Sequence, residues 1–424
     1  MIVVSSVIGV GIFLTPGTVA KVFPEGGWFF FAWLLGGALA LAGALANAEL
    51  GAMFPKAGGN YVYLRAAYHP MAGFLVGWLS FFVIFAGTIA TLAVGFTISL
   101  GSFVTLSPYK ARVVAVIVIW TVSTINAYAT YLGARVNTAT AYLKIGALVL
   151  IVALGPILGS SRAATAPLSP AGDASIASFG VGLAPVLFSY LGWNASVFVA
   201  GEIDRPEKNL PRSLFIGLGI CTTIYLFVTG TFVYALGMKG LIEPGPPSGI
   251  RAGIVLFGEN GGSIIAAIMM ASIFGTVNAN VLVGPRIAYA MASDGLFFRR
   301  AAQLNAHKTP HIAVLAQAAV ATILVIAFDN LDDVLSYTTF AIVLATIADT
   351  GALYVLRARE PNRPRPYRAA GYPIVPGLYL LANVGIAISM VIGKPIQCLT
   401  GLGVLFAGAP FYLLFSARKA REPA

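Results

Sequence analysis

The feature that most constrains this chain is a succession of long apolar runs, each about as long as a helix needs to cross a lipid bilayer. A crossing helix takes about 20 consecutive apolar residues. Of the 424 residues, 58% are hydrophobic and only 10% carry a charge, too few for the surface of a soluble domain. The sequence therefore predicts an all-α polytopic membrane protein with 12 transmembrane helices. They are expected near 1–22, 28–53, 71–103, 112–130, 142–158, 181–203, 213–238, 263–293, 312–328, 334–356, 374–393 and 396–416, the third and eighth being long enough to be tilted or kinked.

The positive charges fall unevenly on the two sides of this topology. Most of the 26 Lys and Arg residues lie in loops on the same side as both chain ends, which predicts cytoplasmic termini. The net charge of +11 thus reflects membrane topology, and no nucleic-acid partner is expected. The basic run from Arg357 to Arg368 predicts contact with phosphates of membrane lipids.

Glycine interrupts two of the apolar runs. The first run contains Gly9 and Gly11, and the sixth contains Gly192. A broken helix exposes backbone N–H and C=O groups, which the membrane interior tolerates only where they line a cavity or bind something. Paired breaks of this kind are the best sequence pointer to the substrate site of a transporter.

The breaks lie five spans apart, and an odd offset makes the second unit cross the membrane in the opposite sense. The sequence predicts a five-plus-five inverted repeat, with units at 1–158 and 181–356 and two accessory helices at 374–416. The segment before Gly9 is only roughly 12 Å of helix, against roughly 15 Å for half a bilayer core. The natural chain is therefore expected to begin upstream of Met1.

The two breaks are suited to clamp an amino acid as a zwitterion. Free N–H groups where the helix resumes at Ile12 suit a carboxylate, because a helix N-terminus carries partial positive charge. Carbonyls near Phe188 and Ser189 carry the opposite partial charge and suit an ammonium. Helix-packing glycine is the alternative interpretation of either segment alone.

Four stretches are more specific than the apolar pattern: Ile8 to Gly17, Phe54 to Tyr61, Phe188 to Asn194, and Glu202 to Arg212. Through them the chain resembles the amino acid–polyamine–organocation superfamily, closest to its L-type amino acid transporter branch and bacterial relatives. The resemblance implies a leucine-transporter-like fold with broken helices 1 and 6. It also implies secondary active transport of amino acids across the cytoplasmic membrane by alternating access.

The resemblance implies site residues as well. Phe188 would be the aromatic gate over the substrate, with Trp193 beside it, although an ordinary lipid- or core-facing Phe is the alternative. The expected substrate-binding residues are Ile8, Gly9, Val10, Gly11, Ile12, Phe188, Ser189, Tyr190, Leu191 and Asn194.

Two departures from the family pattern bear on the substrate. Val10 stands where the family usually has Ser, and Leu191 stands where relatives often have Gly or Asp. An apolar Leu191 offers no counter-charge, which favours small or medium neutral amino acids. Cationic amino acids or polyamines are the alternative substrates.

Lys144 is the candidate coupling residue. Its ammonium would occupy the place where sodium-coupled relatives hold Na⁺, close to Ser272 and Thr276 of the eighth span. A fixed charge in place of the ion predicts sodium-independent transport, by proton symport or exchange. The alternative is an interfacial Lys that snorkels to the cytoplasm.

Three further polar residues sit in apolar spans. Asn278 is expected near the substrate or in a hydrogen bond between helices. Glu49 and Asp349 are expected to be salt-bridge partners, with a proton site as the alternative for each.

Other classes of protein are less well supported. An intramembrane transferase needs a nucleophile or paired His and Asp in the membrane, and the sequence pattern shows no such group. An amino-acid sensor would usually carry an added soluble domain, which this sequence does not show. No cofactor is expected. Branch members joined to a heavy subunit use a Cys between spans 3 and 4. The loop from Leu106 to Arg112 has none, so no disulfide-linked heavy subunit is expected.

Overall fold

Every described element of secondary structure in the computed structural model is a helix. The structure describes residues 2–9, 11–56, 58–128, 130–158, 176–198, 203–328 and 331–421. The helices are α1 (Ile2–Val7), α2 (Gly11–Leu14), α3 (Pro16–Val22), α4 (Gly26–Met53), α5 (Asn60–Ala67), α6 (Pro70–Leu79), the π-helical turn η1 (Ser80–Phe85), α7 (Ala86–Leu100), α8 (Pro108–Tyr128), α9 (Thr130–Leu158), α10 (Ile176–Ser189), α11 (Ala195–Phe198), α12 (Pro206–Ile242), α13 (Ser248–Val283), α14 (Pro285–Ser293), the 3-10 turn η3 (Arg299–Ala302), α15 (His311–Ala327), α16 (Leu331–Arg359), α17 (Ile374–Gly393) and α18 (Pro395–Arg421).

Within the described ranges, 9 helical segments are long and apolar enough to cross a membrane. The number of such segments rises to up to 10 when the bent pair Val3–Leu14 and Pro16–Val22 is counted as one span. An all-helical, multi-span membrane protein is thereby confirmed. The helices at the two remaining expected spans are shorter, with 17 residues in α15 and 14 in α10. The total of twelve and the inverted repeat stay predictions.

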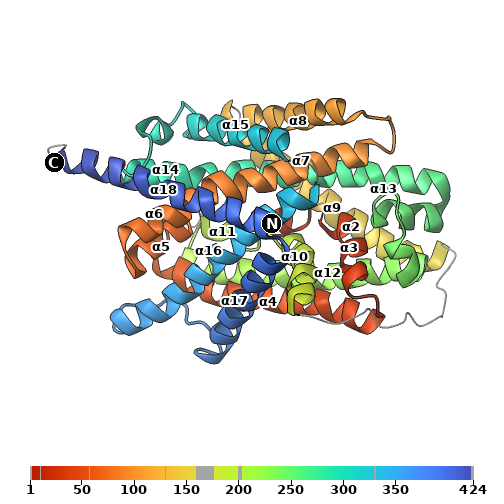
Figure 1. Ribbon diagram of the computed structural model, residues 1–424, viewed down its shortest axis with the longest axis horizontal. Helices are drawn as coiled ribbons and strands as arrows, with labels where there is room; N and C mark the ends of the chain where they lie inside the picture. Colours follow the sequence, from red (N-terminus) through yellow and green to blue (C-terminus); the bar gives the residue numbers. More distant parts are fainter. Residues whose placement is uncertain are drawn as a thin grey trace.

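The long helices run roughly along the longest axis of the molecule (Figure 1). α12 packs along α4, α13 packs against both α7 and α9, and α15 packs against α8. The short α1 contacts α9, α12 and α13, and its residues Val3 and Val4 are buried. The first span therefore lies inside the bundle, where side chains from three later helices can reach its backbone.

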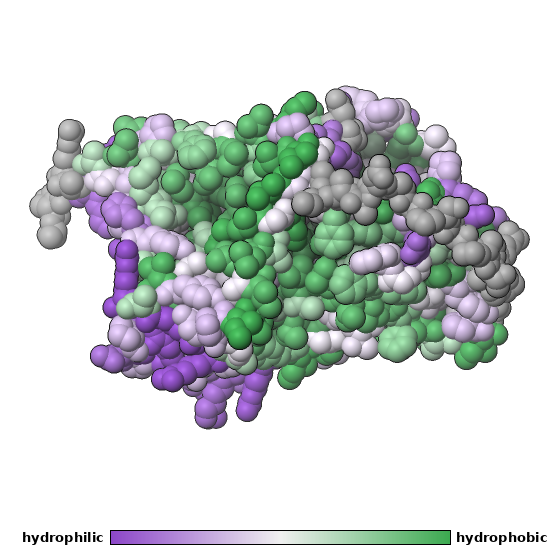
Figure 2. Space-filling view, turned by 60° about the horizontal axis from the view of Figure 1, so that its bottom comes forward, coloured by the Kyte–Doolittle hydropathy of each residue, from purple (hydrophilic) through white to green (hydrophobic). Residues whose placement is uncertain are grey.

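The outer surface carries many exposed apolar side chains. Phe227, Ile323, Leu381 and Ile396 each expose more than half of their surface. Figure 2 shows hydrophobic residues over the middle of the molecule and a hydrophilic patch at one end, where α16 leads into α17. Such a division between an apolar flank and a polar end is what a bilayer requires of the surface in contact with it.

Several expected spans depart from a regular helix. The third contains the π-helical turn η1, and the eighth is interrupted between Val283 and Pro285. The region 239–262, predicted as a loop, is instead largely helical, because α12 and α13 continue past kinks at Gly237 and Gly258. The apolar pattern does not mark these turns of helix, since they lie outside the long hydrophobic runs.

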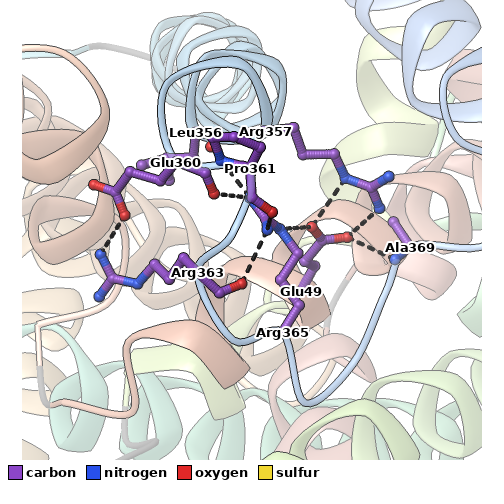
Figure 3. Close-up of polar contacts among 8 residues, drawn as sticks. All are labelled: Glu49, Leu356, Arg357, Glu360, Pro361, Arg363, Arg365 and Ala369. Carbon is purple, nitrogen blue, oxygen red and sulfur yellow. Dashed lines mark hydrogen bonds and ion pairs between the residues drawn. The ribbon is translucent and has the colours of Figure 1, made fainter.

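A buried carboxylate ties α4 to the far end of the chain (Figure 3). Glu49 is fully buried, and its Oε2 accepts a bond from Arg357 at 2.6 Å and another from the Ala369 backbone N–H at 2.7 Å. Its Oε1 accepts from Arg357 Nε at 3.0 Å and lies 3.2 Å from Arg365 Nε. Of the two roles expected for Glu49, the structure shows the salt bridge.

Arg365 also closes the end of α16. Its guanidinium donates to the carbonyls of Leu356 at 3.1 Å and Glu360 at 2.8 Å, which face the end of the helix (Figure 3). The last carbonyls of a helix have no partner within it, and a cation there is favourable. One arginine thus fixes the C-terminal end of α16 and the buried carboxylate of α4 together.

Candidate functional site

The two glycine breaks face each other inside the bundle. The first lies between α1 and α2, where Val10 falls outside the described residues, and the second lies between α10 and α11. A Cβ on Gly11 would lie 2.6 Å from Ser189 Oγ and 2.7 Å from Ser189 Cα. Gly192 has φ +92° and touches Ser6, whose Cβ would be 2.7 Å from an added methyl. Only glycine permits such close approaches. The glycines that interrupt the two helices therefore also allow the two breaks to pack against each other.

The backbone carbonyls of the first break are bound by side chains from other helices. Thr276 Oγ1 of α13 donates to Ile8 O at 3.0 Å, and Ser272 Oγ lies 3.5 Å from the same oxygen. Lys144 Nζ of α9 donates to Ser5 O at 2.9 Å. A helix that breaks in a membrane needs such replacement partners for its freed groups.

Lys144 is buried, with 1% of its surface exposed, and also donates to Thr276 Oγ1 at 2.6 Å. It lies in the middle of α9, because that helix begins at Thr130 rather than near 142. The alternative of an interfacial Lys that reaches the water is therefore wrong. The structure brings Lys144, Ser272 and Thr276 together around the first break, while their role in coupling stays a prediction.

Tyr225 of α12 joins the two breaks. It is not among the site residues expected from the sequence. Its hydroxyl lies 2.8 Å from Val7 O of the first span and 2.8 Å from Ser189 O of the second. It is fully buried and packs its ring against Tyr190 and Trp33. A tyrosine in an apolar span signals a buried hydroxyl in need of a partner, but the pattern does not say where that partner lies.

Replacing Tyr225 by phenylalanine is expected to slow amino acid uptake about 5- to 30-fold. The change leaves two buried carbonyls without this hydroxyl, and the loss of such a shared bond costs about 1–2 kcal/mol in the conformation that needs it. Initial uptake rates in proteoliposomes measure the effect. Tyr354→Phe is the matched control, because its hydroxyl donates to Pro373 O on the exposed end of the molecule. Equal rates for both variants would contradict the joining role of Tyr225.

A pocket opens beside the second break and holds ≈ 590 Å³ of empty volume, its open mouth included. Four consecutive residues of the break form one wall, and polar residues of α1, α5, α13 and α16 face them. These lining residues are Leu191, Gly192, Trp193, Asn194, Ser6, Asn60, Asn280 and Asp349.

The other predicted site residues lie next to this pocket rather than in its wall. Ile8 and Ile12 are fully buried in the hydrophobic core, and Phe188 is 5% exposed within the same core. Ser189 Oγ lies 2.9 Å from Thr15 Oγ1 and donates to Pro185 O. Tyr190 donates to Trp33 O at 3.1 Å and lines a smaller pocket shared with Leu191 and Trp193.

The structure decides between the two alternatives expected for Asn278 of α13. Asn278 bonds between helices, since its Oδ1 accepts from Asn126 at 2.7 Å and its Nδ2 donates to Gly133 O at 2.8 Å. Asn280, two residues later, lines the pocket. Two residues turn a helix by more than half a revolution, so Asn278 and Asn280 face different neighbours.

Outside the membrane-crossing helices, α5 is fastened beside the pocket by a polar cluster. Arg65 pairs with Asp294 in the segment after α14, and Tyr61 donates to the same carboxylate at 2.6 Å. Lys419 of α18 donates to Asp294 O at 2.8 Å. Burial first, and the Asp294 carboxylate second, raise the pKa of the Tyr61 hydroxyl, so it stays a hydrogen-bond donor at physiological pH.

A bundle of membrane-crossing helices with two facing interruptions at its centre defines a membrane transport protein. The chain belongs to the amino acid permease family, whose model matches residues 1–415. It is 32% identical over 424 residues to the serine/threonine exchanger SteT of Bacillus subtilis (strain 168), covering 99% of this chain and 95% of that relative.

More distant relatives come from mammals. The chain is 28% identical to the human large neutral amino acids transporter small subunit 2, over 97% of this chain and 78% of that protein. It is 25% identical to the mouse Asc-type amino acid transporter 1, over 97% of this chain and 79% of that protein. These matches confirm the family resemblance and amino acid transport or exchange as the class of function.

Proposed function

We propose that the chain carries small or medium neutral amino acids across the cytoplasmic membrane by alternating access, without sodium, by exchange or proton symport. The observation that supports this most strongly is the pair of facing breaks, whose carbonyls are bound by Tyr225, Thr276 and Lys144. A Lys ammonium bound to a carbonyl in the last turn of α1, next to the break, supplies the positive charge that a cation would otherwise bring.

The architecture proposed with this function has twelve spans. Two inverted units of five helices, at 1–158 and 181–356, would enclose the breaks, and the helices at 374–416 would be accessory. The hydrophilic end in Figure 2 would face the cytoplasm, because it carries the arginine-rich segment between α16 and α17. The pocket beside Asn60 and Asp349 would then be the inner vestibule.

Three observations bear on the substrate. Leu191 lines the pocket and carries no charge, which favours a neutral side chain. The relative SteT is named as a serine/threonine exchanger, and a mammalian relative as a large neutral amino acids transporter. We therefore propose L-serine, L-threonine and similar neutral amino acids as the first substrates to test.

Uptake of a radiolabelled amino-acid panel by proteoliposomes that contain this chain alone tests the proposal. We expect uptake of neutral amino acids that is unchanged when choline replaces Na⁺ and that needs no second subunit. Parallel vesicles with internal substrate, or with a pH gradient, separate exchange from proton symport. Uptake confined to arginine, lysine or polyamines would overturn the proposed substrate class, and no uptake of any amino acid would overturn the function.

A further inference from the structure

Phe198 is the last residue of α11, the short helix that follows the second break. It is 3% exposed and forms part of the pocket wall. Its ring meets Phe85 of η1 edge to face, with ring centroids 5.2 Å apart and an interplanar angle of 86°. Aromatic pairs favour this arrangement, so the Phe198 ring has a defined resting place beside the pocket.

The other side of the ring rests on bare backbone ahead of α5. A Cβ on Gly59 would lie 2.2 Å from Phe198 Cδ1 and 2.8 Å from its Cγ. The Gly58 backbone N–H donates to Phe198 O at 3.4 Å. Gly59 also has φ +54° and ψ −128°, a conformation that residues with a side chain rarely adopt. Gly58 and Gly59 thus form a seat for the ring, and both belong to the stretch Phe54 to Tyr61 that helps to carry the family resemblance.

The seat lies on the side of the pocket that leads toward the hydrophilic end of the molecule. α5 begins at Asn60, in the pocket wall, and ends at Ala67. Ala67 O accepts a hydrogen bond from Arg359, the last residue of α16, at 3.0 Å. The hydrophilic patch of Figure 2 lies where α16 leads into α17. α5 therefore fixes the seat to the hydrophilic end.

The arm that carries Phe198 is short and joined to α10 only through the break. α11 has four residues, and Gly192, with φ +92°, lies between it and α10. On the other side of the break, Ser189 O is held by the Tyr225 hydroxyl at 2.8 Å. A few residues at the end of a helix suffice to absorb the backbone rotation of a hinge. The break thus separates a fixed part, α10, from an arm whose angle can change.

We propose that Phe198 is a latch on the inner side of the pocket. Seated on Gly59 and against Phe85, its ring closes the pocket toward the hydrophilic end, and it leaves the seat when substrate is released on that side. This inference rests on the proposed transport function and adds a residue that holds one state of alternating access closed. The latch closes by apolar fit and contains no charged side chain, so added salt does not screen it.

A cysteine beyond the latch reports whether the latch is closed. Thr88 is 3% exposed, lines the pocket and lies about one helical turn beyond Phe85. Thr88→Cys is therefore the reporter, and the native Cys221 and Cys398 are both buried. A membrane-impermeant methanethiosulfonate reagent, applied from the side of the hydrophilic end, is expected to label it slowly. Adding Phe198→Ala is expected to raise the labelling rate at least about 10-fold, because truncation destabilises the state in which the ring is buried.

Vesicles of both orientations are compared, and the increase is expected only from the side of the hydrophilic end. Phe81→Ala is the matched control, because Phe81 is 1% exposed and lies in the same hydrophobic cluster without lining the pocket. It is expected to keep the rate within about 2-fold, since a change away from the pocket has no differential effect on the open and closed states.

If Phe198→Ala does not fold, Phe198→Leu replaces it, and the loss of the ring with an apolar side chain kept is expected to raise the rate about 3-fold. Unchanged labelling in the folded Phe198 variants would overturn the latch. So would an equal increase in Phe81→Ala, or an increase from the opposite side of the membrane. Because labelling needs no substrate, each of these results would leave uptake by the unmodified chain, and with it the proposed function, standing.

Discussion

Replacing Glu49 by glutamine is expected to lower the free energy of unfolding by about 3–5 kcal/mol, the usual cost of removing one partner from a buried ion pair. The carboxylate is fully buried, while the side chains of Arg357 and Arg365 are 21% and 5% exposed. The variant leaves these two guanidinium groups facing a neutral amide. Arg365 also binds the last carbonyls of α16, so the loss is expected to loosen the junction of α16 and α17 as well.

The thermal unfolding temperature of the purified protein in detergent measures this effect, with the yield of folded protein as a second readout. Glu360→Gln is the matched control, because the side chains of its ion pair with Arg363 are 38% and 34% exposed and such pairs contribute about 0–1 kcal/mol. An unfolding temperature equal to that of the control would show that the buried cluster does not hold α4 to the α16–α17 junction.

Changing Lys144 to methionine is expected to lower amino acid transport at least about 10-fold. Methionine has a similar length but no donor, so Ser5 O and Thr276 Oγ1 both lose their charged partner. Loss of a charge-assisted hydrogen bond in a buried site costs about 1.5–3 kcal/mol, and here the bond holds the end of α1 next to the first break. Initial rates of uptake and of exchange in proteoliposomes measure the effect.

Lys239→Met is the control for Lys144, because Lys239 is exposed near the end of α12. It is expected to keep full transport. Both proteins are compared in Na⁺ and in choline. A strict sodium requirement in the unmodified chain would show that Lys144 does not stand in for the ion, and undiminished transport by Lys144→Met would show that its contacts are dispensable.

The class of fold is readable from the sequence because it depends on composition and on run length alone. The breaks are readable for a similar reason: Gly11 and Gly192 occupy positions that no other residue can fill. The helical turns between 239 and 262 were not predicted, because they lie outside the long apolar runs from which the spans were predicted. The start of α9 at Thr130 was also missed, which left open whether Lys144 reached the water.

The site itself depends on contacts between distant segments, and these are not encoded locally. Glu49 and Asp349 are equivalent as sequence, each an acid in an apolar span. The structure gives Glu49 two arginines and leaves one oxygen of Asp349 without a partner in the described chain. Tyr225 likewise gains its importance only when two unwound segments meet at its hydroxyl.

The Glu49 cluster has a consequence for how the chain is made. Arg357 follows Glu49 by 308 residues, so α4 enters the membrane long before its partner exists. At about 5–20 residues per second, the ribosome needs roughly 15–60 s to reach it. During that interval the Glu49 carboxylate must stay near the aqueous interface or bind another partner. The docking of α4 against the end of α16 is therefore among the last steps of biogenesis, and nascent chains that stop before Arg357 hold an acid that their own sequence has not yet neutralised.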